Sequence, residues 1–249
     1  MNSLALIRES RQGPMDVALS HSILAAVSAR EMGPTLRLHV SGAMVAFGRA
    51  DRVTPGYDTA VRAARAHGFA AVERLAGGRA AVFHELTIAF SLALPEADPK
   101  TRIHDRFEMV ATLMAEAFES LGIDARIGEL PGEYCPGRWS VNVGGKVKVM
   151  GLGQRLVRRA AHIGGVVVVD DGDRIRDVLI PVYRALGLDW DPRTAGSLAD
   201  RSPGLTPELV MESIEDRFRR RFSVVEAELP PEIAHHAERL VAEHLSEVA

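Results

Sequence analysis

The chain has 249 residues, of which 47% are hydrophobic and 25% charged, and its formal net charge is −3 at pH 7. This composition is typical of a globular protein, and the charge balance gives no general basic surface for nucleic acid. The only cysteine, Cys135, excludes an internal disulfide and is typical of a reducing compartment, so we expect a cytoplasmic protein. The longest aliphatic run, residues 166–169, is too short to cross a bilayer, and no membrane contact is expected.

The first half of the chain is expected to mix helices and strands. Apolar residues at helical spacing predict helices, and alternation or short apolar runs between turn residues predict strands. The predicted helices of this half are residues 16–30, 58–68 and 103–121. The predicted strands are residues 36–40, 44–47, 70–75, 79–84 and 86–94.

The second half begins with strands and ends with helices. The predicted strands are residues 124–128, 139–143, 146–150, 152–158 and 161–169, and the predicted helices are residues 173–186, 206–222 and 231–247. A mainly antiparallel sheet flanked by segregated helices is the α+β class. A stretch rich in Pro, Gly and Ser, residues 191–207, predicts a catalytic core over 1–190 and a C-terminal helical segment over 191–249, packed on or next to it.

Two arginines flank the glycine loop that follows residues 70–75. Arg74 lies before Gly77 and Gly78, and Arg79 lies directly after them. Paired glycines let a backbone approach a ligand closely because no Cβ stands in the way. Arginines at either side could hold a carboxylate or phosphate through paired hydrogen bonds. A tight hairpin with two solvated arginines explains the same residues, so the loop alone leaves both interpretations open.

Cys135 heads a segment that contains two of the three lysines of the chain, Lys146 and Lys148. Positive charge elsewhere is almost exclusively arginine, so these lysines indicate a need for a compact amine. A thiolate can carry an acyl group as a thioester, and a cationic amine beside it would favour the thiolate and stabilise an oxyanion. The alternative is a small buried apolar residue, which is the commoner fate of a lone intracellular cysteine.

The glycine-rich stretch over residues 144–155 carries both lysines. In a regular strand Lys146 and Lys148 lie on one face and Val149 lies on the other. Two lysines followed by glycines indicate the wall of a pocket, while the alternative is an edge strand protected by lysine. The nearest histidines, His84 and His162, have no second cysteine or histidine at metal-ligand spacing, so we predict no metal site.

The order of these motifs resembles the lipoate and octanoate protein ligase and transferase family, over roughly residues 15–220. In that family an arginine precedes a Gly-Gly loop and a strand with a His-acid pair. A lysine then precedes a glycine and a glutamine, and a later histidine precedes an aliphatic strand. The matching residues are Arg74, Gly77, Gly78, His84, Glu85, Lys148, Gly151, Gln154 and His162. The resemblance implies a catalytic domain of the biotin/lipoate protein ligase type.

Two residues separate the kinds of enzyme within that family. Arg79 stands where the ATP-dependent ligases resemble one another in a third glycine, and Cys135 with its Pro-Gly is similar to the segment of the cysteine-dependent octanoyltransferases and amidotransferases. The resemblance therefore implies transfer of an octanoyl or lipoyl group through a Cys135 thioester, from an acyl-protein donor to the lysine of a lipoyl-carrier domain. Glycine cleavage H protein and 2-oxoacid dehydrogenase E2 carry such domains. No cofactor is required for this reaction.

The resemblance also implies a role for each matched residue. Cys135 is the nucleophile, and Lys148 positions the acyl carbonyl and stabilises its oxyanion. Gly77, Gly78 and Val149 line an apolar acyl tunnel. The other expected substrate-binding residues are Arg74, Arg79, His84, Gly151, Gln154 and His162.

Two other functions remain open from the sequence. In an ATP-dependent lipoate–protein ligase, which needs ATP and Mg, Arg74 and Lys148 would contact the phosphate of an acyl-adenylate, and Cys135 would be structural. A non-catalytic lipoyl or acyl binder could keep the same fold. Biotin transfer is disfavoured because the chain has no Gly-Arg-Gly-Arg adenylate loop.

Overall fold

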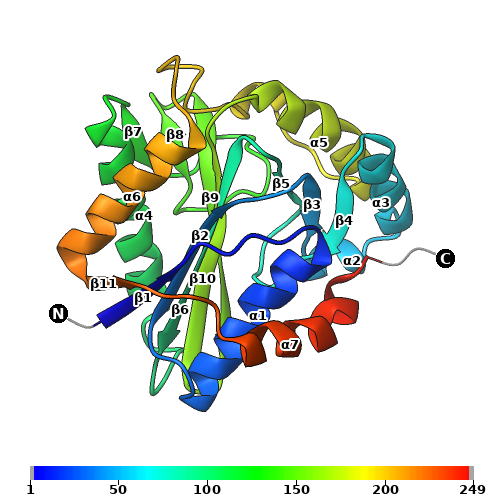
Figure 1. Ribbon diagram of the computed structural model, residues 1–249. Helices are drawn as coiled ribbons and strands as arrows, with labels where there is room; N and C mark the ends of the chain where they lie inside the picture. Colours follow the sequence, from blue (N-terminus) through cyan, green and yellow to red (C-terminus); the bar gives the residue numbers. More distant parts are fainter. Residues whose placement is uncertain (1–2, 247–249) are drawn as a thin grey trace.

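The computed structural model describes residues 3–246, and its largest element is a mixed sheet of eight strands (Figure 1). In chain order these are β1 (Ser3–Ile7), β2 (Thr35–Val40), β6 (Thr87–Pro95), β7 (Ala125–Ile127), β8 (Val141–Val143), β9 (Val147–Val157), β10 (Ala160–Val168) and β11 (Ser223–Glu226). Across the sheet they run in the order β11-β1-β2-β6-β10-β9-β8-β7. β1 pairs in parallel with β2 and β11, and the pairs from β2 to β7 are antiparallel.

A second sheet places β3 (Met44–Phe47) between β4 (Ala70–Glu73) and β5 (Ala81–Phe83). The helices are α1 (Pro14–Ala29), α2 (Arg49–Arg52), α3 (Tyr57–Ala66), α4 (Ile103–Ser120), α5 (Gly172–Leu186), α6 (Pro207–Arg221) and α7 (Pro231–Leu240). Two short 3-10 helices, η1 (Pro192–Thr194) and η2 (Val241–His244), complete the described elements. Sheets flanked by helices confirm the predicted α+β class.

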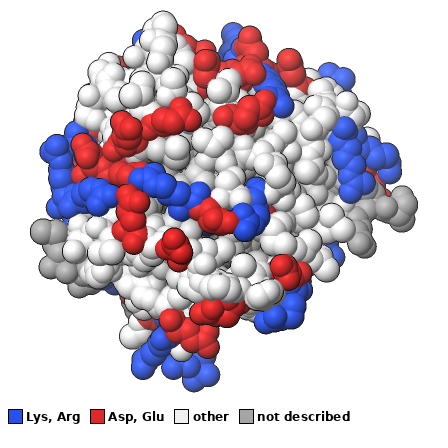
Figure 2. Space-filling view, viewed as in Figure 1, with Lys and Arg blue, Asp and Glu red and all other residues white. Residues whose placement is uncertain are grey.

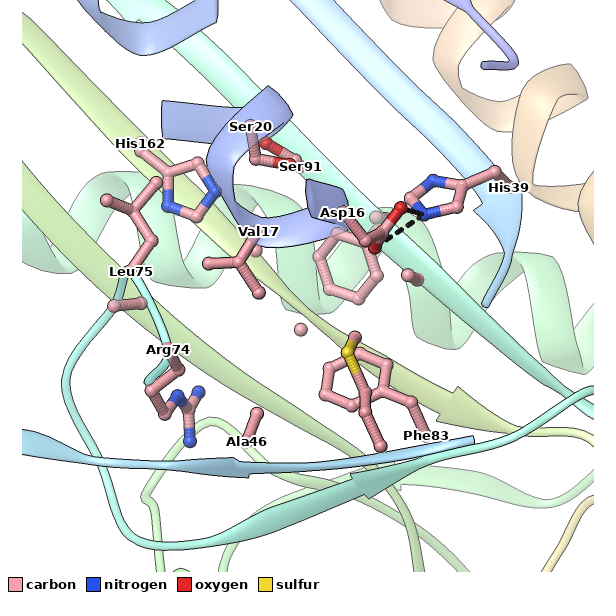
Figure 3. A pocket seen from close by; sticks show the side chains of 16 residues that line it. Asp16, Val17, Ser20, His39, Ala46, Arg74, Leu75, Phe83, Ser91 and His162 are labelled. Carbon is pink, nitrogen blue, oxygen red and sulfur yellow. Dashed lines mark hydrogen bonds and ion pairs between the residues drawn. The ribbon is translucent and has the colours of Figure 1, made fainter. Parts of the chain in front are cut away.

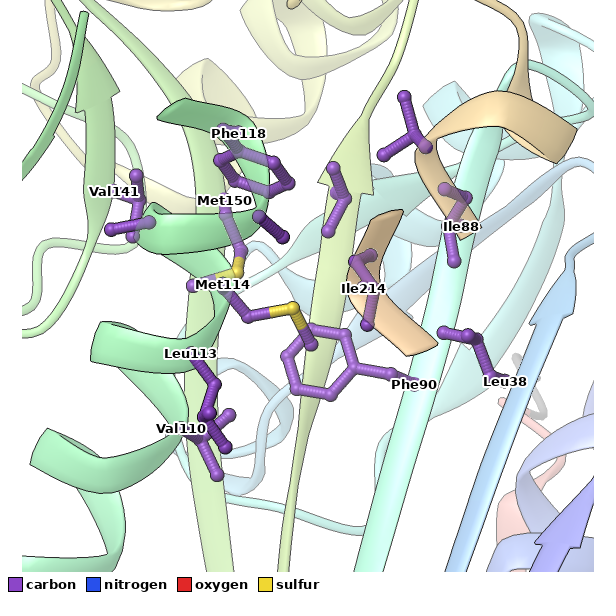
Figure 4. Packing of buried hydrophobic residues seen from close by; sticks show 14 of the residues in the cluster. Leu38, Ile88, Phe90, Val110, Leu113, Met114, Phe118, Val141, Met150 and Ile214 are labelled. Atoms are coloured by element: carbon purple, nitrogen blue, oxygen red, sulfur yellow. The ribbon is translucent and has the colours of Figure 1, made fainter. Parts of the chain in front are cut away.

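The helices cover the main sheet from both sides. α4 and α6 pack together over one face, whereas α1 lies over the other face and α7 packs on α1 (Figure 1). The face under α4 and α6 is apolar because alternate strand residues such as Leu38, Ile88 and Phe90 pack against Phe118 and Ile214 (Figure 4). This apolar face holds the largest core of the fold.

The opposite face of the same strands carries polar side chains that are also buried. Arg37 and His39 on β2 alternate with leucines, and they lie beside Ser91 on β6 and His162 on β10. These side chains point toward α1 rather than toward solvent. The sheet therefore separates an apolar core from a buried polar layer, and the second layer adjoins the cavity described below.

Most predicted elements are confirmed within a few residues, with four differences. The sequence analysis did not predict β1, β11 or the one-turn α2. The predicted strands 146–150 and 152–158 form the single strand β9 because Gly151 and Gly153 continue in extended conformation. α3 begins at Tyr57, after Gly56, and not at Asp58. The last predicted helix divides into α7 and η2, and its predicted end at 247 lies outside the described residues.

The segment after residue 190 contacts several parts of the core. α6 packs on α4, α7 packs on α1, and β11 pairs with β1 at the edge of the main sheet. The division at residue 190 remains a prediction.

Charges of both signs are intermixed on the face seen in Figure 2, consistent with the small net charge. One exposed pair of opposite charges is Arg219 and Glu226, which lie 3.5 Å apart. Within residues 3–246, every helix is too short or too polar to traverse a bilayer.

Candidate active site

Cys135 lies in a loop whose backbone is fixed by side chains from other elements. Its φ of 41° is in the left-handed region, which is costly for a residue with a Cβ and persists only where surrounding contacts hold it. The Cys135 N–H donates to the hydroxyl oxygen of Tyr183 at 2.8 Å, and its carbonyl accepts from Lys148 Nζ at 2.7 Å. The Tyr183 hydroxyl donates in turn to the Ala80 carbonyl at 3.1 Å. These contacts therefore fix the backbone of the half-buried Cys135.

The sulfur of Cys135 faces the glycine loop. The backbone N–H of Arg79 donates to Sγ at 3.1 Å, and Nη1 of Arg74 lies 3.8 Å from Sγ. Arg74 Nη1 also donates to the Arg79 carbonyl at 2.9 Å, which ties the loop to the guanidinium. Gly78 has φ +114°, and a Cβ there would lie 3.0 Å from Sγ. The two motifs that the sequence analysis treated separately thus form one site.

Lys148 is buried beneath the cysteine loop with three partners for its ammonium group. Nζ donates to Glu133 Oε1 at 2.9 Å, to the Tyr134 carbonyl at 2.9 Å and to the Cys135 carbonyl at 2.7 Å. Glu133 also accepts from Ser140 Oγ at 2.6 Å. Lys146 is different, because it lies exposed in the turn before β9. The expectation that both lysines share one strand face is therefore wrong.

A bulge in β9 explains how Lys148 and Gly151 reach the same side of the sheet. Lys148 pairs with Asn142 and Met150 pairs with Val141, so Val149 is an extra residue. The extra residue shifts the alternation, and the position of a Cβ on Gly151 is only 3.3 Å from Lys148 Cε. Val149 belongs to the apolar core under α4. The structure therefore contradicts its predicted place in an acyl tunnel.

A cavity of about 70 Å³ lies between the polar face of the main sheet, α1 and the small sheet (Figure 3). Arg74, which contacts Cys135 Sγ, also lines this cavity, and so does His162. The volume has room for roughly five to seven water-sized groups. Glycine at 164 keeps the space open beside His162, because a Cβ there would lie 2.8 Å from its ring. We call this space the acyl cavity below, after the occupant that the resemblance in the sequence leads us to expect.

Buried charges form the far side of the acyl cavity. The carboxylate of Asp16 on α1 pairs with Arg37 and with His39 Nε2, the latter at 3.0 Å. Burial alone would raise the pKa of Asp16, but His39 and Arg37 lower it to about 2. Burial lowers the pKa of His162 to about 3, with Arg74 adding to the effect, so this imidazole is neutral at physiological pH.

Three other predicted residues do not reach the acyl cavity with their side chains. The Arg79 guanidinium turns to the buried Asp51 at 3.2 Å, so only the Arg79 N–H serves the cysteine. His84 is buried in the turn between β5 and β6, where Nδ1 accepts from the Leu86 N–H at 3.2 Å. Gln154 joins β9 to α4 by donating to the Ile103 carbonyl at 2.7 Å. Their side chains are structural in this arrangement.

Sequence reasoning missed the residues that position the cysteine and line the far side of the acyl cavity. Tyr183 lies 48 residues after Cys135 in the sequence, and Glu133 lies two residues before it. Of these two residues, only Glu133 is close enough to Cys135 in the sequence to belong to the same local motif. Asp16 on α1 carried no signal, and His39 carried none beyond the alternation of β2. Among residues 3–246, no group of three or more His, Cys, Asp or Glu side chains is placed to hold a metal ion.

Comparison with known proteins links this geometry to a group of acyl-transferring enzymes. Octanoyl-[GcvH]:protein N-octanoyltransferase of Geobacillus kaustophilus (strain HTA426) is 31% identical over 187 residues, which are 73% of this chain and 66% of that protein. Lipoyl-[GcvH]:protein N-lipoyltransferase of Listeria monocytogenes serovar 1/2a (strain ATCC BAA-679 / EGD-e) is 25% identical over 74% of this chain and 69% of its own length. The chain thus spans about two thirds of the length of these relatives, and just under two thirds of the length of the first.

Solved structures share the fold. Lipoate-protein ligase A bound with ATP superposes with a TM-score of 0.78 and 18% identity, over 98% of this chain and 95% of that one. A lipoate protein ligase from Thermoplasma acidophilum with bound lipoic acid gives a TM-score of 0.75 at 18% identity, over 98% and 96% of the two chains. The family model of the lipoyl protein ligase A/B catalytic domain matches residues 13–219. Because that match covers most of the chain and includes Arg74, Cys135 and Lys148, the protein belongs to the lipoyl protein ligase A/B catalytic domain family.

Proposed function

We propose that this protein is an acyltransferase that moves an octanoyl or lipoyl group through a Cys135 thioester to the lysine of a lipoyl-carrier domain. The observation that carries the proposal is the placement of Cys135 Sγ against the Arg79 N–H and against Arg74, which also lines a mainly apolar cavity. The relatives named as octanoyl-[GcvH]:protein and lipoyl-[GcvH]:protein transferases support the same acyl groups, an acylated GcvH-like carrier protein as donor and a second protein as acceptor.

The first half-reaction transfers the acyl group to sulfur. The Cys135 thiolate attacks the carbonyl carbon of the donor, a new S–C bond forms, and the bond from that carbon to the donor amine or thiol breaks. The departing donor group takes up the proton that the thiol gave up. The Arg79 N–H and the Arg74 guanidinium are placed to stabilise negative charge on sulfur before the attack.

The second half-reaction transfers the acyl group to the acceptor. The lysine amine of the acceptor attacks the thioester carbon, a C–N bond forms, and the C–S bond breaks as sulfur regains a proton. Lys148 Nζ donates a hydrogen bond to the Cys135 carbonyl, so the ammonium group lies next to the reacting residue. In this proposal one of its N–H groups moves from a loop carbonyl to the acyl oxygen as charge develops there.

The acyl chain occupies the acyl cavity. Its apolar wall buries methylenes, each worth about 0.8 kcal/mol in transfer free energy. Arg74 borders both the sulfur and the cavity and so guides the chain from one to the other. Gly78, whose missing Cβ leaves space at the sulfur, is the glycine that admits the donor.

The proposal requires no nucleotide, because the thioester supplies the activated acyl group that ATP would otherwise create. Its donor is an acylated carrier protein, its acceptor is the lipoyl-carrier domain of glycine cleavage H protein or of a 2-oxoacid dehydrogenase E2, and its compartment is the cytoplasm. The single cysteine and the relatives that act on GcvH support these assignments.

Transfer between two carrier domains tests the proposed function. The protein is mixed with octanoylated H protein and an unmodified E2 lipoyl domain, with ATP and magnesium removed by apyrase and chelator, and the E2 domain is weighed by mass spectrometry. We expect octanoylation at a rate that ATP does not change. Acylation that requires ATP and free lipoate, with none from the acylated donor, would assign the protein to the ligases instead.

A further inference from the structure

A surface groove of about 420 Å³ adjoins the candidate active site. Arg74 and Leu75 line both this groove and the acyl cavity, so the two spaces are neighbours. Arg74 also reaches the nucleophile, because its Nη1 lies 3.8 Å from Cys135 Sγ. We call the space the basic groove, after Arg49, Arg52, Arg74 and Arg155 in its wall.

Arginine dominates the charge of the basic groove. Among the described residues, its wall holds four arginines and only two carboxylates, Glu73 and Glu243. Glu73 is paired with Arg52 at 3.0 Å, whereas Arg49 and Arg155 are exposed and make no ion pair within residues 3–246. The whole chain has a formal net charge of −3, so this local excess of positive charge opposes the average. An acidic partner is therefore attracted to this part of the surface.

Two histidines that also line the basic groove are engaged with each other. His21 Nδ1 lies 3.0 Å from His244 Nε2, and His244 Nδ1 donates to the Glu73 carbonyl at 2.9 Å. Burial lowers the pKa of both histidines. The positive charge of the groove therefore comes from arginine, which stays charged at every physiological pH.

Arg49 and Arg155 flank the glycine loop that contacts the thiol. Arg49 follows Gly48, where an added Cβ would lie 1.8 Å from the Gly78 carbonyl oxygen. Arg155 lies one residue after the β9 carbonyl that accepts from the Gly77 N–H at 3.3 Å. Gly77 and Gly78 are themselves exposed. A partner bound to the two arginines therefore borders the loop at which the thiol lies.

An exposed apolar side chain lies at the edge of the basic groove. Val53, directly after α2, is 80% exposed, more than any other large hydrophobic side chain among residues 3–246. Arginine beside an apolar contact is typical of protein–protein interfaces. A small anion would use only the arginines, whereas a protein surface can use the arginines and Val53 together. The groove therefore fits an acidic protein better than a free anion.

We propose that the basic groove is the docking surface for the carrier domain, which presents carboxylates near its modified lysine to Arg49 and Arg155 and an apolar side chain to Val53. This inference rests on the proposed function in taking a carrier domain as the partner. Docking at this surface brings the modified lysine to the glycine loop beside Cys135. The carboxylates of the partner stay outside the acyl cavity.

Binding of unmodified H protein tests the inference without requiring transfer. Biolayer interferometry measures Kd for the wild type, Arg49→Glu/Arg155→Glu and Arg220→Glu/Arg221→Glu, at low salt and at about 150 mM salt. The two double variants have the same net charge, but Arg220 and Arg221 are exposed at the end of α6. We expect the groove variant to raise Kd at least about tenfold at low salt, the α6 variant to match the wild type, and added salt to weaken wild-type binding.

Three results of the binding experiment would contradict the inference. They are equal Kd values for the three proteins, a larger effect in the α6 variant, and no measurable wild-type binding at either salt concentration. Circular dichroism confirms that both variants are folded before their Kd values are compared.

A small uncharged donor separates docking from chemistry. S-octanoyl-N-acetylcysteamine has no protein part, so the groove variant should form the acyl-enzyme from it at the wild-type rate. With octanoylated H protein as donor, the same variant should lose about tenfold in kcat/KM through a higher KM. Equal losses with both donors would show that the arginines act on the active site and not on docking. If the proposed function is wrong, the wild type forms no acyl-enzyme from either donor, while the Kd comparison still decides the docking surface.

Discussion

Gly78 and Cys135 approach each other so closely that each restricts the other. Gly78 adopts a φ of +114°, and a Cβ added there would lie 2.9 Å from Arg74 Nη1 and 3.0 Å from Cys135 Sγ. The oxygen of Gly78 is in turn packed against Gly48, where an added Cβ would lie 1.8 Å away. The loop therefore has no space for a side chain on the face that meets the nucleophile.

Replacing Gly78 with alanine should slow acyl transfer. The added methyl group strains the backbone and pushes on the thiol and on Arg74, and strain of about 1–3 kcal/mol corresponds to a rate loss of roughly tenfold or more. Gly77→Ala is the matched change, because a Cβ there would meet nothing within 4 Å. Steady-state transfer between carrier domains measures both variants. Equal effects of the two substitutions would mean that the close approach at Gly78 has no role.

At the scale of elements, the bulge in β9 places Lys148 under the loop of residues 130–140. The side chains of Lys148 and Glu133 are 1% and 0% exposed. Water therefore reaches neither charge, and each charge is compensated by the other. Removing one partner of a buried ion pair leaves the other charge without compensation. Lys148 therefore links the stability of the loop to the chemistry that we propose for Cys135.

Lys148→Ala should lower both stability and rate. Leaving Glu133 unpaired should cost about 3–5 kcal/mol in the free energy of unfolding. Loss of the donor to the developing oxyanion should lower the rate by roughly two to three decades, measured where circular dichroism shows the variant folded. The exposed Lys146→Ala is the matched control and should change neither quantity. Equal or larger damage from Lys146→Ala would show that the wrong lysine has been assigned.

The sequence predicted elements better than it predicted side-chain directions. Helices such as α4 and α5 were predictable because their apolar periodicity is strong. β1 and β11 were not, because strands of five and four residues carry little pattern. Val149 was expected to line an acyl tunnel but packs in the core under α4. The bulge at Val149 depends on pairing with Asn142 and Val141, which no local spacing reveals.

The candidate site was predictable where chemistry and motif coincide, at Cys135, Lys148, Arg74 and the glycine loop. The sequence could not give the Tyr183 contact, which joins residues 48 apart. It also could not show that the Arg79 guanidinium turns to Asp51, since that depends on the position of α2. These features arise from tertiary packing rather than from local preference.

At the scale of the whole molecule, several histidines are buried in neutral form. Burial lowers the pKa values of His39, His84 and His162, the last to about 3. An exposed histidine titrates near 6.5, so the unfolded chain binds protons that the folded protein does not. The stability from each such group is fully present above about pH 6.5 and is lost as pH falls from there toward the folded pKa. Asp16 adds a loss of stability in the same direction, as pH falls from the ordinary carboxyl pKa of 3.8 to the lowered pKa of about 2.

The free energy of unfolding should therefore decline below about pH 6.5. His162 alone should contribute a slope of about 1.4 kcal/mol per pH unit between about pH 6 and 4. Urea unfolding at several pH values in this window measures the slope. His162→Gln should flatten it, whereas the exposed His235→Gln should leave it unchanged. A His162→Gln slope equal to that of wild type would show that His162 is not buried as a neutral group.

The thioester on Cys135 is the central claim, and intact-mass analysis after incubation with an acylated carrier protein and no acceptor tests it most directly. The wild-type protein should gain the mass of one acyl group, hydroxylamine should remove it, and Cys135→Ala should show neither adduct nor transfer. The Cys135 backbone is held by Tyr183 and Lys148, so the alanine variant should keep the loop in place. Full acylation of a carrier domain by Cys135→Ala would contradict the thioester mechanism.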